Sequence, residues 1–379
     1  MRLIAGLLAL TALLPGPPAK AGYALKGVRI LDVVTGRYSE PSVVLLSGSR
    51  IERILPAAQY AAALADSTID LTGKYLLPGL IDGHVHFSLA GPIRANALAT
   101  VRAGFTTVAD LGARGQRVLR FRDSVNAGTA PGPRILAAGL WIGIQGGVCE
   151  FSGLGVAGGA DAFRQRVIEN IQAGADVIKL CVSGWPAESF ANPGKYELSD
   201  SILSASVAEA HRAGKLVIAH DLSREGVRAG LAAGVDGLAH AAYLDSALAL
   251  EMKRRNVFLI PTLASLTGGD SSQPSRALIE ATRLAHRLGV SIVLGTDAGV
   301  IRHGENAVEF AALAGAGLSP IDAIRAATIH AARALRLADS VGTVTPGMVA
   351  DLIVLDRDPL QDLAALRSPF LVLARGKPQ

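Results

Sequence analysis

The chain changes its pattern of apolar and polar positions twice. From Gly27 to Pro78, short apolar runs such as GVRILDV and PSVVLLSG alternate with turn residues, and the same texture returns near the C-terminus in GTVTPGMVADLIVLDRD. Between about residues 80 and 337, short β-branched runs alternate with Ala-rich stretches of helical period. This alternation is typical of βα units in a parallel sheet. The pattern therefore predicts a central α/β region flanked by two strand-rich segments.

Eight such units can be counted in the central region. Their strands are expected to begin at Leu80, Thr106, Arg134, Asp176, Lys215, Asp236, Val257 and Ser291. Several helices end in Ala-Gly, which predicts a glycine C-cap just before the next strand. Eight units of this length match the usual size of a (β/α)8 TIM barrel. We expect such a barrel over residues 79–338, with a small discontinuous β-sandwich domain built from residues 22–78 and 339–379. The alternative fold is a doubly wound open sheet, but that fold gives no reason for eight strands.

The N-terminal segment, residues 1–21, has the plan of a secretory signal peptide. Arg2 supplies a short positive region, Leu3 to Leu14 form an apolar stretch, and Ala19-Lys20-Ala21 offers a cleavage site. The stretch is too short to span a bilayer. An N-terminal core helix is the alternative. We expect cleavage near Ala21 and a periplasmic or secreted protein without membrane attachment.

Composition narrows the function classes. The 379 residues are 50% hydrophobic and 18% charged, which is too apolar for a disordered chain. Two cysteines are too few for a disulfide scaffold. The formal net charge is +5 and no run of Lys or Arg occurs, so nucleic acid and anionic membranes are poor candidates as partners. Cys149 and Cys181 can pair in an oxidising compartment or remain as buried thiols, and both options stay open.

Histidines gather at predicted strand ends, where a barrel carries its reactive groups. His84 and His86 are one residue apart, so both side chains point to the same face of the first strand. His220 and His240 lie near the ends of the fifth and sixth strands, and Asp297 ends the eighth. One histidine on an apolar strand is usually a core residue, but convergence of several with a carboxylate favours a site for Zn²⁺ or a similar ion.

Lys179 lies in the middle of the otherwise apolar fourth strand. A buried lysine is rare unless it has a partner or a task. One interpretation is a side chain that extends out of the strand end into solvent. The other is a neutral amine that has taken up CO₂ to become a carbamate, a carboxylate on a long stem that can bridge two metals.

These residues together resemble the amidohydrolase superfamily of metal-dependent hydrolases, in its binuclear class. The resemblance covers essentially the whole chain beyond Ala21, and it is strongest to the imidazolonepropionase-like group that includes prolidase-like Xaa-amino-acid dipeptidases. It is carried by the run from Pro78 to His86 (PGLIDGHVH), Lys179, His220, His240 and Asp297.

The resemblance implies a ligand set. His84, His86 and Asp297 would hold one metal, His220 and His240 would hold a second, and carboxylated Lys179 would bridge the two. Two zinc ions per chain are implied, with other divalent metals as alternatives.

Residues on the substrate side are also implied. Tyr243 matches a carbonyl-polarising tyrosine of such dipeptidases, or is a packing residue at the strand end. His303 resembles a substrate-side loop residue. Where relatives read Gly-Gly-His after the third strand, this chain reads Gly146-Gly147-Val148-Cys149-Glu150. Glu150 then either takes a polar role toward substrate or lies in solvent.

The implied reaction is hydrolysis of an amide-type C–N bond in a small molecule, a dipeptide or an N-acyl amino acid. A hydroxide bridging the metals attacks the carbonyl, Asp297 acts as general base, and Tyr243 assists at the oxyanion. Substrate choice is assigned to the loops at residues 141–160, 183–200 and 264–274, the second of which carries Trp185 and Pro186 as a rigid apolar wall.

Four alternatives remain at this point. They are a mononuclear cyclic amide or amidine hydrolase, a deaminase, a lactonase, and a non-catalytic periplasmic metal- or ligand-binding protein. Lys179 argues against the mononuclear enzymes, and Asp297 argues against the binding protein, which needs no general base. A homo-oligomer is compatible with the sequence.

Overall fold

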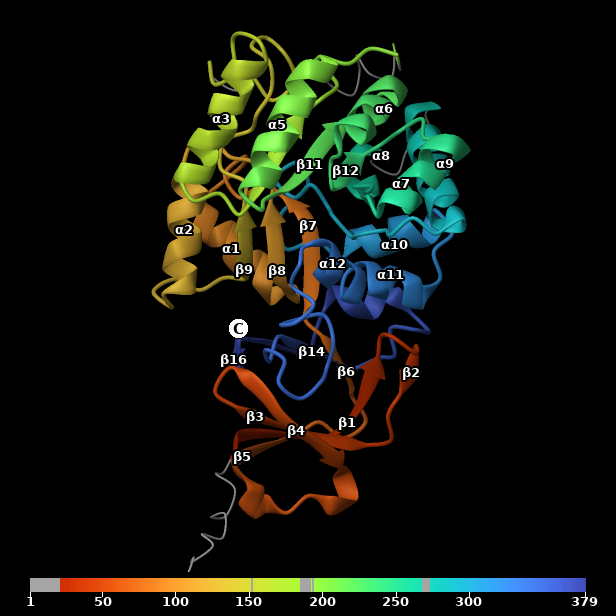
Figure 1. Cartoon of the computed structure of the whole chain (residues 1–379). Helices are drawn as coiled ribbons and strands as arrows, with labels where there is room; N and C mark the ends of the chain where they lie inside the picture. Colours follow the sequence, from red (N-terminus) through yellow and green to blue (C-terminus); the bar gives the residue numbers. More distant parts are fainter. Residues whose placement is uncertain (1–20, 151–152, 185–191, 193, 268–272) are drawn as a thin grey trace, which may run out of the picture.

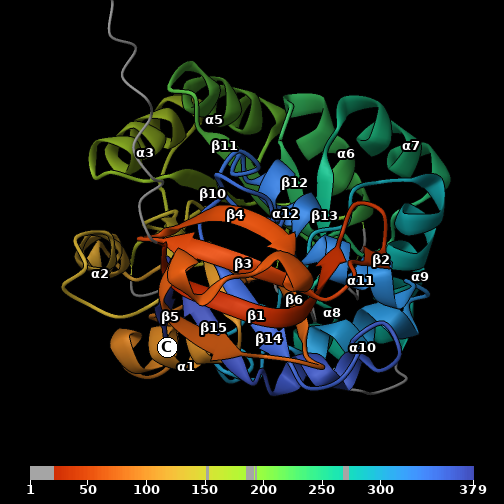
Figure 2. The same ribbon diagram turned by 90° about the horizontal axis from the view of Figure 1, so that it is seen from below.

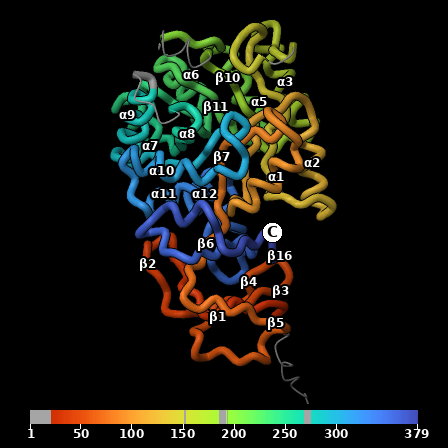
Figure 3. Tube along the Cα trace, turned by 180° about the vertical axis from the view of Figure 1, so that it is seen from behind, coloured from red at the N-terminus to blue at the C-terminus, as the bar shows by residue number. Residues whose placement is uncertain are grey.

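A computed structural model describes residues 21–150, 153–184, 192, 194–267 and 273–379. Figure 1 shows an α/β part above a smaller sheet part. The smaller part comes from both ends of the chain, and the tube in Figure 3 shows the blue C-terminal segment running among the red and orange N-terminal strands. The two strand-rich segments thus lie together beneath the α/β part.

The smaller part is a nine-stranded sheet with the order β16-β15-β14-β6-β1-β3-β4, in which β2 and β5 also pair with β1. The N-terminal strands are β1 (Ala21–Asp32), β2 (Arg37–Tyr38), β3 (Ser42–Ser47), β4 (Arg50–Pro56), β5 (Ala65–Asp70) and β6 (Tyr75–Pro78). The C-terminal strands are β14 (Leu352–Leu355), β15 (Leu371–Ala374) and β16 (Lys377–Pro378). β6 pairs antiparallel with β14, which joins the two segments. The β-sandwich arrangement and the domain bounds stay predictions.

Strand β3 shows why this sheet forms. Successive side chains of a strand point to opposite faces. Val44 and Leu46 enter one buried cluster, whereas Val43 and Leu45 enter another. This apolar run is therefore covered on both faces.

The α/β part contains two groups of parallel strands. β7 (Leu80–Val85), β8 (Phe105–Asp110) and β9 (Arg134–Ala137) form one, and β10 (Val177–Cys181), β11 (Leu216–Asp221), β12 (Gly237–His240) and β13 (Phe258–Ile260) form the other. Isolated parallel bridges link the groups, at Ile142–Leu180 on one side and at Leu259–Ile292 and Val85–Ala298 on the other. The result is a curled sheet. Seven predicted strands are present, but the eighth segment, from Ser291, forms only isolated bridges rather than a regular strand.

Helices surround this sheet on the outside, as the view from below in Figure 2 shows. They are α1 (Ile93–Arg102), α2 (Arg117–Asn126), α3 (Ala160–Gln172), α5 (Asp200–Arg212), α6 (Arg224–Ala233), α7 (Ser246–Arg255), α8 (Leu263–Thr267), α9 (Gln273–Leu288), α10 (Val308–Gly315), α11 (Pro320–Ala326) and α12 (Ile329–Ala334). Short 3-10 turns lie at Ala57–Gln59, Ala62–Leu64 and Leu363–Arg367. Within the described residues, no helix has the length and apolarity needed to cross a membrane.

Local signals fix where these helices begin and end. Ser199, Ser223 and Asp245 cap α5, α6 and α7 by accepting a hydrogen bond from a backbone N–H of the first turn. Gly234 ends α6 in the left-handed conformation at φ 90°, which confirms one predicted glycine C-cap.

The parallel register brings the carboxyl ends of the strands to one edge of the curled sheet. Cys181 pairs with His220, and Asp221 pairs with His240. The bridge from Val85 to Ala298 places the end of β7 beside the segment that carries Asp297. Histidines and an aspartate from distant parts of the chain therefore meet at this edge.

Candidate metal centre

The predicted ligands line one small pocket of about 90 Å³. The polar residues that line it are His84, His86, Lys179, His220, His240 and Asp297. They come from β7 and the residue that follows it, from β10, β11 and β12, and from the segment that follows residue 291. Strand ends that lie far apart in the sequence thus contribute to a single site.

Three ligand-type atoms converge most closely at the end of β7. The Nε2 atoms of His84 and His86 are 3.1 Å apart. They lie 3.5 Å and 3.2 Å from Oδ1 of Asp297. All three side chains are buried, and their donor atoms lie within 4.8 Å of one another. Two imidazoles and a carboxylate in this arrangement can hold a divalent metal.

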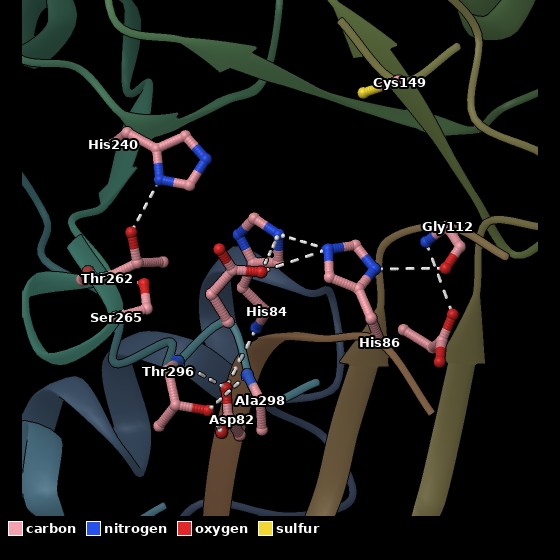
Figure 4. A network of polar contacts seen from close by, with 12 residues as sticks. Asp82, His84, His86, Gly112, Cys149, His240, Thr262, Ser265, Thr296 and Ala298 are labelled. Atoms are coloured by element: carbon pink, nitrogen blue, oxygen red, sulfur yellow. Dashed lines mark hydrogen bonds and ion pairs between the residues drawn. The ribbon is translucent and has the colours of Figure 1, made fainter. Parts of the chain in front are cut away.

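A hydrogen bond at its other ring nitrogen, Nδ1, orients the His86 ring. Its Nδ1 lies 3.1 Å from the carbonyl oxygen of Gly112, as Figure 4 shows. A carbonyl only accepts, so Nδ1 carries the hydrogen and Nε2 keeps its lone pair for the cavity. This is the orientation that metal-binding histidines usually have.

The other imidazoles complete the wall. The ring centroids of His220 and His240 are 4.5 Å apart, and that of His84 is 5.4 Å from His240. Burial lowers the pKa of His84 and His240 well below the ordinary range, and burial together with the Lys179 charge lowers the pKa of His220 to about 3. The rings are therefore neutral and able to donate lone pairs.

Lys179 is fully buried among these rings. Its side chain is 1% exposed, which excludes the interpretation that it extends into solvent. Burial lowers the pKa of its amine to about 7, although Asp297 opposes this shift. Within the described part of the chain, Nζ of Lys179, Nε2 of His220 and Nδ1 of His84 have no hydrogen-bond partner. Buried polar atoms without partners are costly, so this donor set fits a metal site.

Asp297 remains a carboxylate in this environment. Burial by itself would raise its pKa, but the neighbouring imidazoles of His84 and His86 outweigh burial and hold the pKa well below its usual range. Its backbone has φ 56°, a left-handed conformation that is rare outside glycine. His240, Ala241, Tyr243 and Thr262 share this conformation, at φ 73°, 49°, 60° and 51°. Such strain clusters at functional sites.

A buried carboxylate that the sequence reasoning missed ties two of the ligand segments together. Asp82 accepts hydrogen bonds from the backbone N–H groups of His84 (3.1 Å) and Thr296 (3.0 Å). It also accepts from the Thr296 hydroxyl (2.6 Å) and the Asn306 amide (2.8 Å). Burial raises the pKa of Asp82 to about 6 despite these donors. Its place two residues before His84 was the signal available in the sequence.

Asp110 performs a similar task at the end of β8. It accepts from the backbone N–H groups of Phe87 (2.7 Å) and Gly112 (3.3 Å). Gly112 in turn holds the His86 ring, so Asp110 positions a ligand through the backbone.

The predicted substrate-side residues lie outside the described lining of the cavity. Tyr243 packs at the edge of the main apolar cluster, where burial raises the pKa of its hydroxyl and keeps it protonated. His303 is buried, with Nδ1 3.1 Å from the Thr100 hydroxyl and Nε2 3.3 Å from the His86 carbonyl oxygen. Their roles toward substrate stay predictions.

The loop after β9 differs from the expectations in one respect. Glu150 is half-buried and accepts a hydrogen bond from the backbone N–H of Gly155, at 2.9 Å, so it bonds its own loop rather than extending into solvent. Cys149 and Cys181 form a disulfide, which settles the alternative left open above. Trp185 and Pro186 lie outside the described residues.

Comparison with known proteins also points to metal-dependent hydrolases. The model of the Amidohydrolase family matches residues 75–377. Ochratoxinase from Aspergillus niger is 28% identical, over 82% of this chain and 78% of its own length. The crystal structure of a Xaa-Pro dipeptidase with bound methionine has a TM-score of 0.88 at 26% identity, covering 94% of this chain and 99% of that one. A putative prolidase from Bifidobacterium longum has a TM-score of 0.85 at 31% identity, covering 96% and 95%.

The curled α/β sheet and its cluster of histidines and carboxylate define a metal-binding hydrolase. The chain belongs to the Amidohydrolase family, and it is an enzyme that hydrolyses carbon–nitrogen bonds.

Proposed function

We propose that this protein is an exported, zinc-dependent amidohydrolase that cleaves the amide bond of a dipeptide or an N-acyl amino acid. The observation that carries the proposal is the meeting of six ligand-type side chains in one pocket with an apolar wall. The relatives support the bond type, since a Xaa-Pro dipeptidase and an ochratoxinase are similar to this chain over most of its length.

Two ions fit the donor set. His84, His86 and Asp297 would hold the first, His220 and His240 the second, and Lys179 as a carbamate would bridge them. A Lys179 amine with a pKa near 7 has a neutral fraction able to take up CO₂. When bound, such ions supply an activated water and polarise the scissile carbonyl.

Side chains carry out the proton transfers and stabilise the oxyanion. Asp297, ionised and at the centre of the site, accepts the proton of the attacking water and delivers it to the leaving amine. Tyr243, with its hydroxyl protonated, donates to the developing oxyanion when substrate is bound.

The wall of the cavity indicates the substrate. The described lining residues other than the ligands are all uncharged: Leu89, Trp141, Val148, Cys149 and Val300. A substrate group beside the scissile bond would therefore be apolar, because a charge there would be desolvated without a partner.

Architecture and location are part of the proposal. The isolated bridges from the loop after β9 to β10, and from β13 through residues 292–298 to β7, support a closed (β/α)8 barrel. The signal-like segment up to Ala21 and the Cys149–Cys181 disulfide support export to an oxidising compartment.

The test is a substrate library on zinc-reconstituted protein, with metal content measured on the same sample. Hydrolysis of N-acyl amino acids or dipeptides with apolar side chains, at close to two metals per chain, is expected. Ammonia release from a cyclic amidine at one metal per chain would identify a deaminase instead, and preferential ester cleavage would identify a lactonase. Asp297→Asn is expected to lower kcat by about 10³-fold or more; hydrolysis that survives in this variant contradicts the assigned base.

A further inference from the structure

The wall of the cavity is built mainly by the loop that follows β9. Trp141 and Val148 are buried and, with Cys181, form a small apolar cluster of their own, against which Leu89 and Cys149 pack. Trp141 also faces the His86 ring, with 5.4 Å between the ring centroids. This loop therefore contacts a proposed ligand and lines the space that substrate would enter.

The beginning of the loop is anchored to the strand that carries Lys179. Ile142 donates to the carbonyl of Lys179 at 3.2 Å and accepts from the backbone N–H of Cys181 at 2.9 Å. Among the described backbone hydrogen bonds, none joins Val148 or Cys149 to β10. Val148 donates its backbone N–H to Glu197, and Cys149 follows in a left-handed conformation at φ 65°.

The disulfide adds a covalent link between this part of the loop and β10. It joins Cys149, at the end of the wall, to Cys181, two residues after Lys179 on β10. Residues i and i+2 share one face of a strand, so Cys181 lies on the same face as Lys179. The bond thus links the wall directly to the face of the strand that forms the site, and Figure 4 shows Cys149 across from the imidazoles of His86 and His240.

The packing around the bond is tight. A Cβ placed on Gly143 would lie 2.6 Å from the carbonyl oxygen of Val148, 3.2 Å from Cβ of Cys181 and 3.6 Å from Cβ of Cys149. Only glycine lets the outgoing and returning parts of the loop approach this closely. The loop is therefore built to hold the disulfide against the cavity.

We propose that the Cys149–Cys181 disulfide is the positioning element for substrate: it holds Val148 and Cys149 at a set place beside the reacting centre and presents an uncharged surface to the apolar substrate group. The inference rests on the proposed amide hydrolysis. It assigns the bond a task in binding substrate rather than in holding metal, because neither sulfur belongs to the proposed ligand set.

Reduction tests this directly, because these are the two cysteines of the whole chain. Tris(2-carboxyethyl)phosphine breaks the S–S bond: phosphorus is oxidised and takes its oxygen from water, and the two protons of that water end on the two sulfurs. The reagent can reduce only this disulfide, because the chain has no other cysteines, and thiol titration measures the fraction of protein that is reduced. The double variant Cys149→Ala with Cys181→Ala removes the bond without creating thiols that bind metal, and it covers the case in which the bond resists reduction.

Three readouts are taken on zinc-loaded protein. KM for an N-acyl amino acid with an apolar side chain is expected to rise about tenfold, while kcat stays within about threefold, as for a loss of binding contacts that are equal in the ground state and the transition state. Hydrogen exchange of the peptide covering residues 141–149 is expected to accelerate, and metal content is expected to stay constant. Gly143→Ala, which displaces the same wall with the bond intact, should also raise KM; Gly159→Ala, in the same loop with nothing near its Cβ, should not.

The outcomes separate the two proposals. If the oxidised protein hydrolyses no amide, the proposed function fails, and the exchange measurement still shows whether the bond orders the wall. If the oxidised protein is active and both reduction and the double variant leave KM and exchange unchanged, the disulfide has no positioning role. Loss of metal on reduction would also overturn the inference, because it would assign the bond to the metal site.

Discussion

The Nδ1 atom of His240 lies 2.6 Å from Oγ1 of Thr262. The same hydroxyl lies 2.8 Å from the carbonyl oxygen of Pro261, which can only accept a hydrogen bond. The single hydroxyl hydrogen therefore goes to Pro261, and Oγ1 accepts from Nδ1–H of His240. This leaves Nε2 of His240 unprotonated, as for His86 on the other side of the site, with a lone pair available to the proposed second metal.

This relationship predicts the effect of removing the hydroxyl. Thr262→Val keeps the shape of the side chain but leaves Nδ1–H of His240 without its acceptor. We expect metal affinity to fall about 10- to 100-fold, measured by competition with a chelator of known affinity. Thr262→Ser keeps the acceptor and should bind metal like the wild type. Equal affinity in the valine and serine variants would show that the tautomer is set in another way.

A glycine beside His84 sets a second prediction. A Cβ on Gly295 would lie 2.2 Å from Cγ2 of Ile260 and 2.9 Å from Cβ of His84. Gly295→Ala is therefore expected to destabilise the protein by about 1–3 kcal/mol and to weaken metal binding, because the strand ends must move apart. Chemical denaturation and metal content measure the two effects.

The matched control is Gly315→Ala at the end of α10, where a Cβ meets nothing within 4 Å. This variant should be neutral or slightly stabilising. A Gly295→Ala protein with unchanged stability and full metal content would mean that the strand ends have room that the structure does not show.

The sequence allowed the strand positions and the ligand types to be predicted for physical reasons. Alternating βα patterns are local, and so is the spacing of His84 and His86 on one strand face. The supporting network was not predictable in this way. Asp82 meets Thr296 and Asn306 through contacts between opposite ends of the α/β part, and no local pattern marks them. The eighth segment keeps single backbone bonds to its neighbours, such as Asp297 N–H to the His84 carbonyl, but Thr296 donates its backbone N–H to the Asp82 side chain.

Metal removal should reveal how much the stability of the protein depends on bound metal. A chelator would leave the carbamate proposed on Lys179 and the lone pairs of the imidazoles without a cation. We expect loss of activity and a fall in Tm of about 5–10 °C, corresponding to a few kcal/mol of binding free energy. Zinc added back with bicarbonate should restore both, since bicarbonate supplies CO₂ for Lys179. A Tm that does not respond to chelation while metal is lost would contradict this account.

Glu309 predicts a dependence of stability on pH. It is buried in α10, and its two oxygens accept from the backbone N–H groups of Leu263 (2.8 Å) and Ala264 (2.7 Å). Burial raises its pKa from 4.5 to about 8, although those two donors oppose the shift. The folded state therefore binds the proton more tightly than the unfolded state. Its contribution is fully present below about pH 4.5 and is lost as the pH rises through about 8.

Glu309→Gln cannot titrate, so this part of the pH dependence should disappear. Between pH 5 and pH 8.5 the free energy of unfolding of the wild type should fall more than that of the variant, by roughly 2–5 kcal/mol. Urea denaturation of zinc-saturated protein at both pH values measures the difference. Glu305→Gln, at an exposed position nearby, should follow the wild type. Parallel curves for Glu309→Gln and the wild type would show that Glu309 ionises alike in both states.

The pairing of β6 with β14 has a consequence for how the protein folds during its synthesis. During translation β6 emerges early, whereas the partner for its open edge leaves the ribosome only after the entire α/β part has been made. The terminal sheet therefore stays unfinished for most of synthesis. The segment up to Ala21 is proposed to direct export. In that case the delay is useful, because a sheet that cannot fold before its last strands are made leaves the chain unfolded enough to pass through a translocation channel.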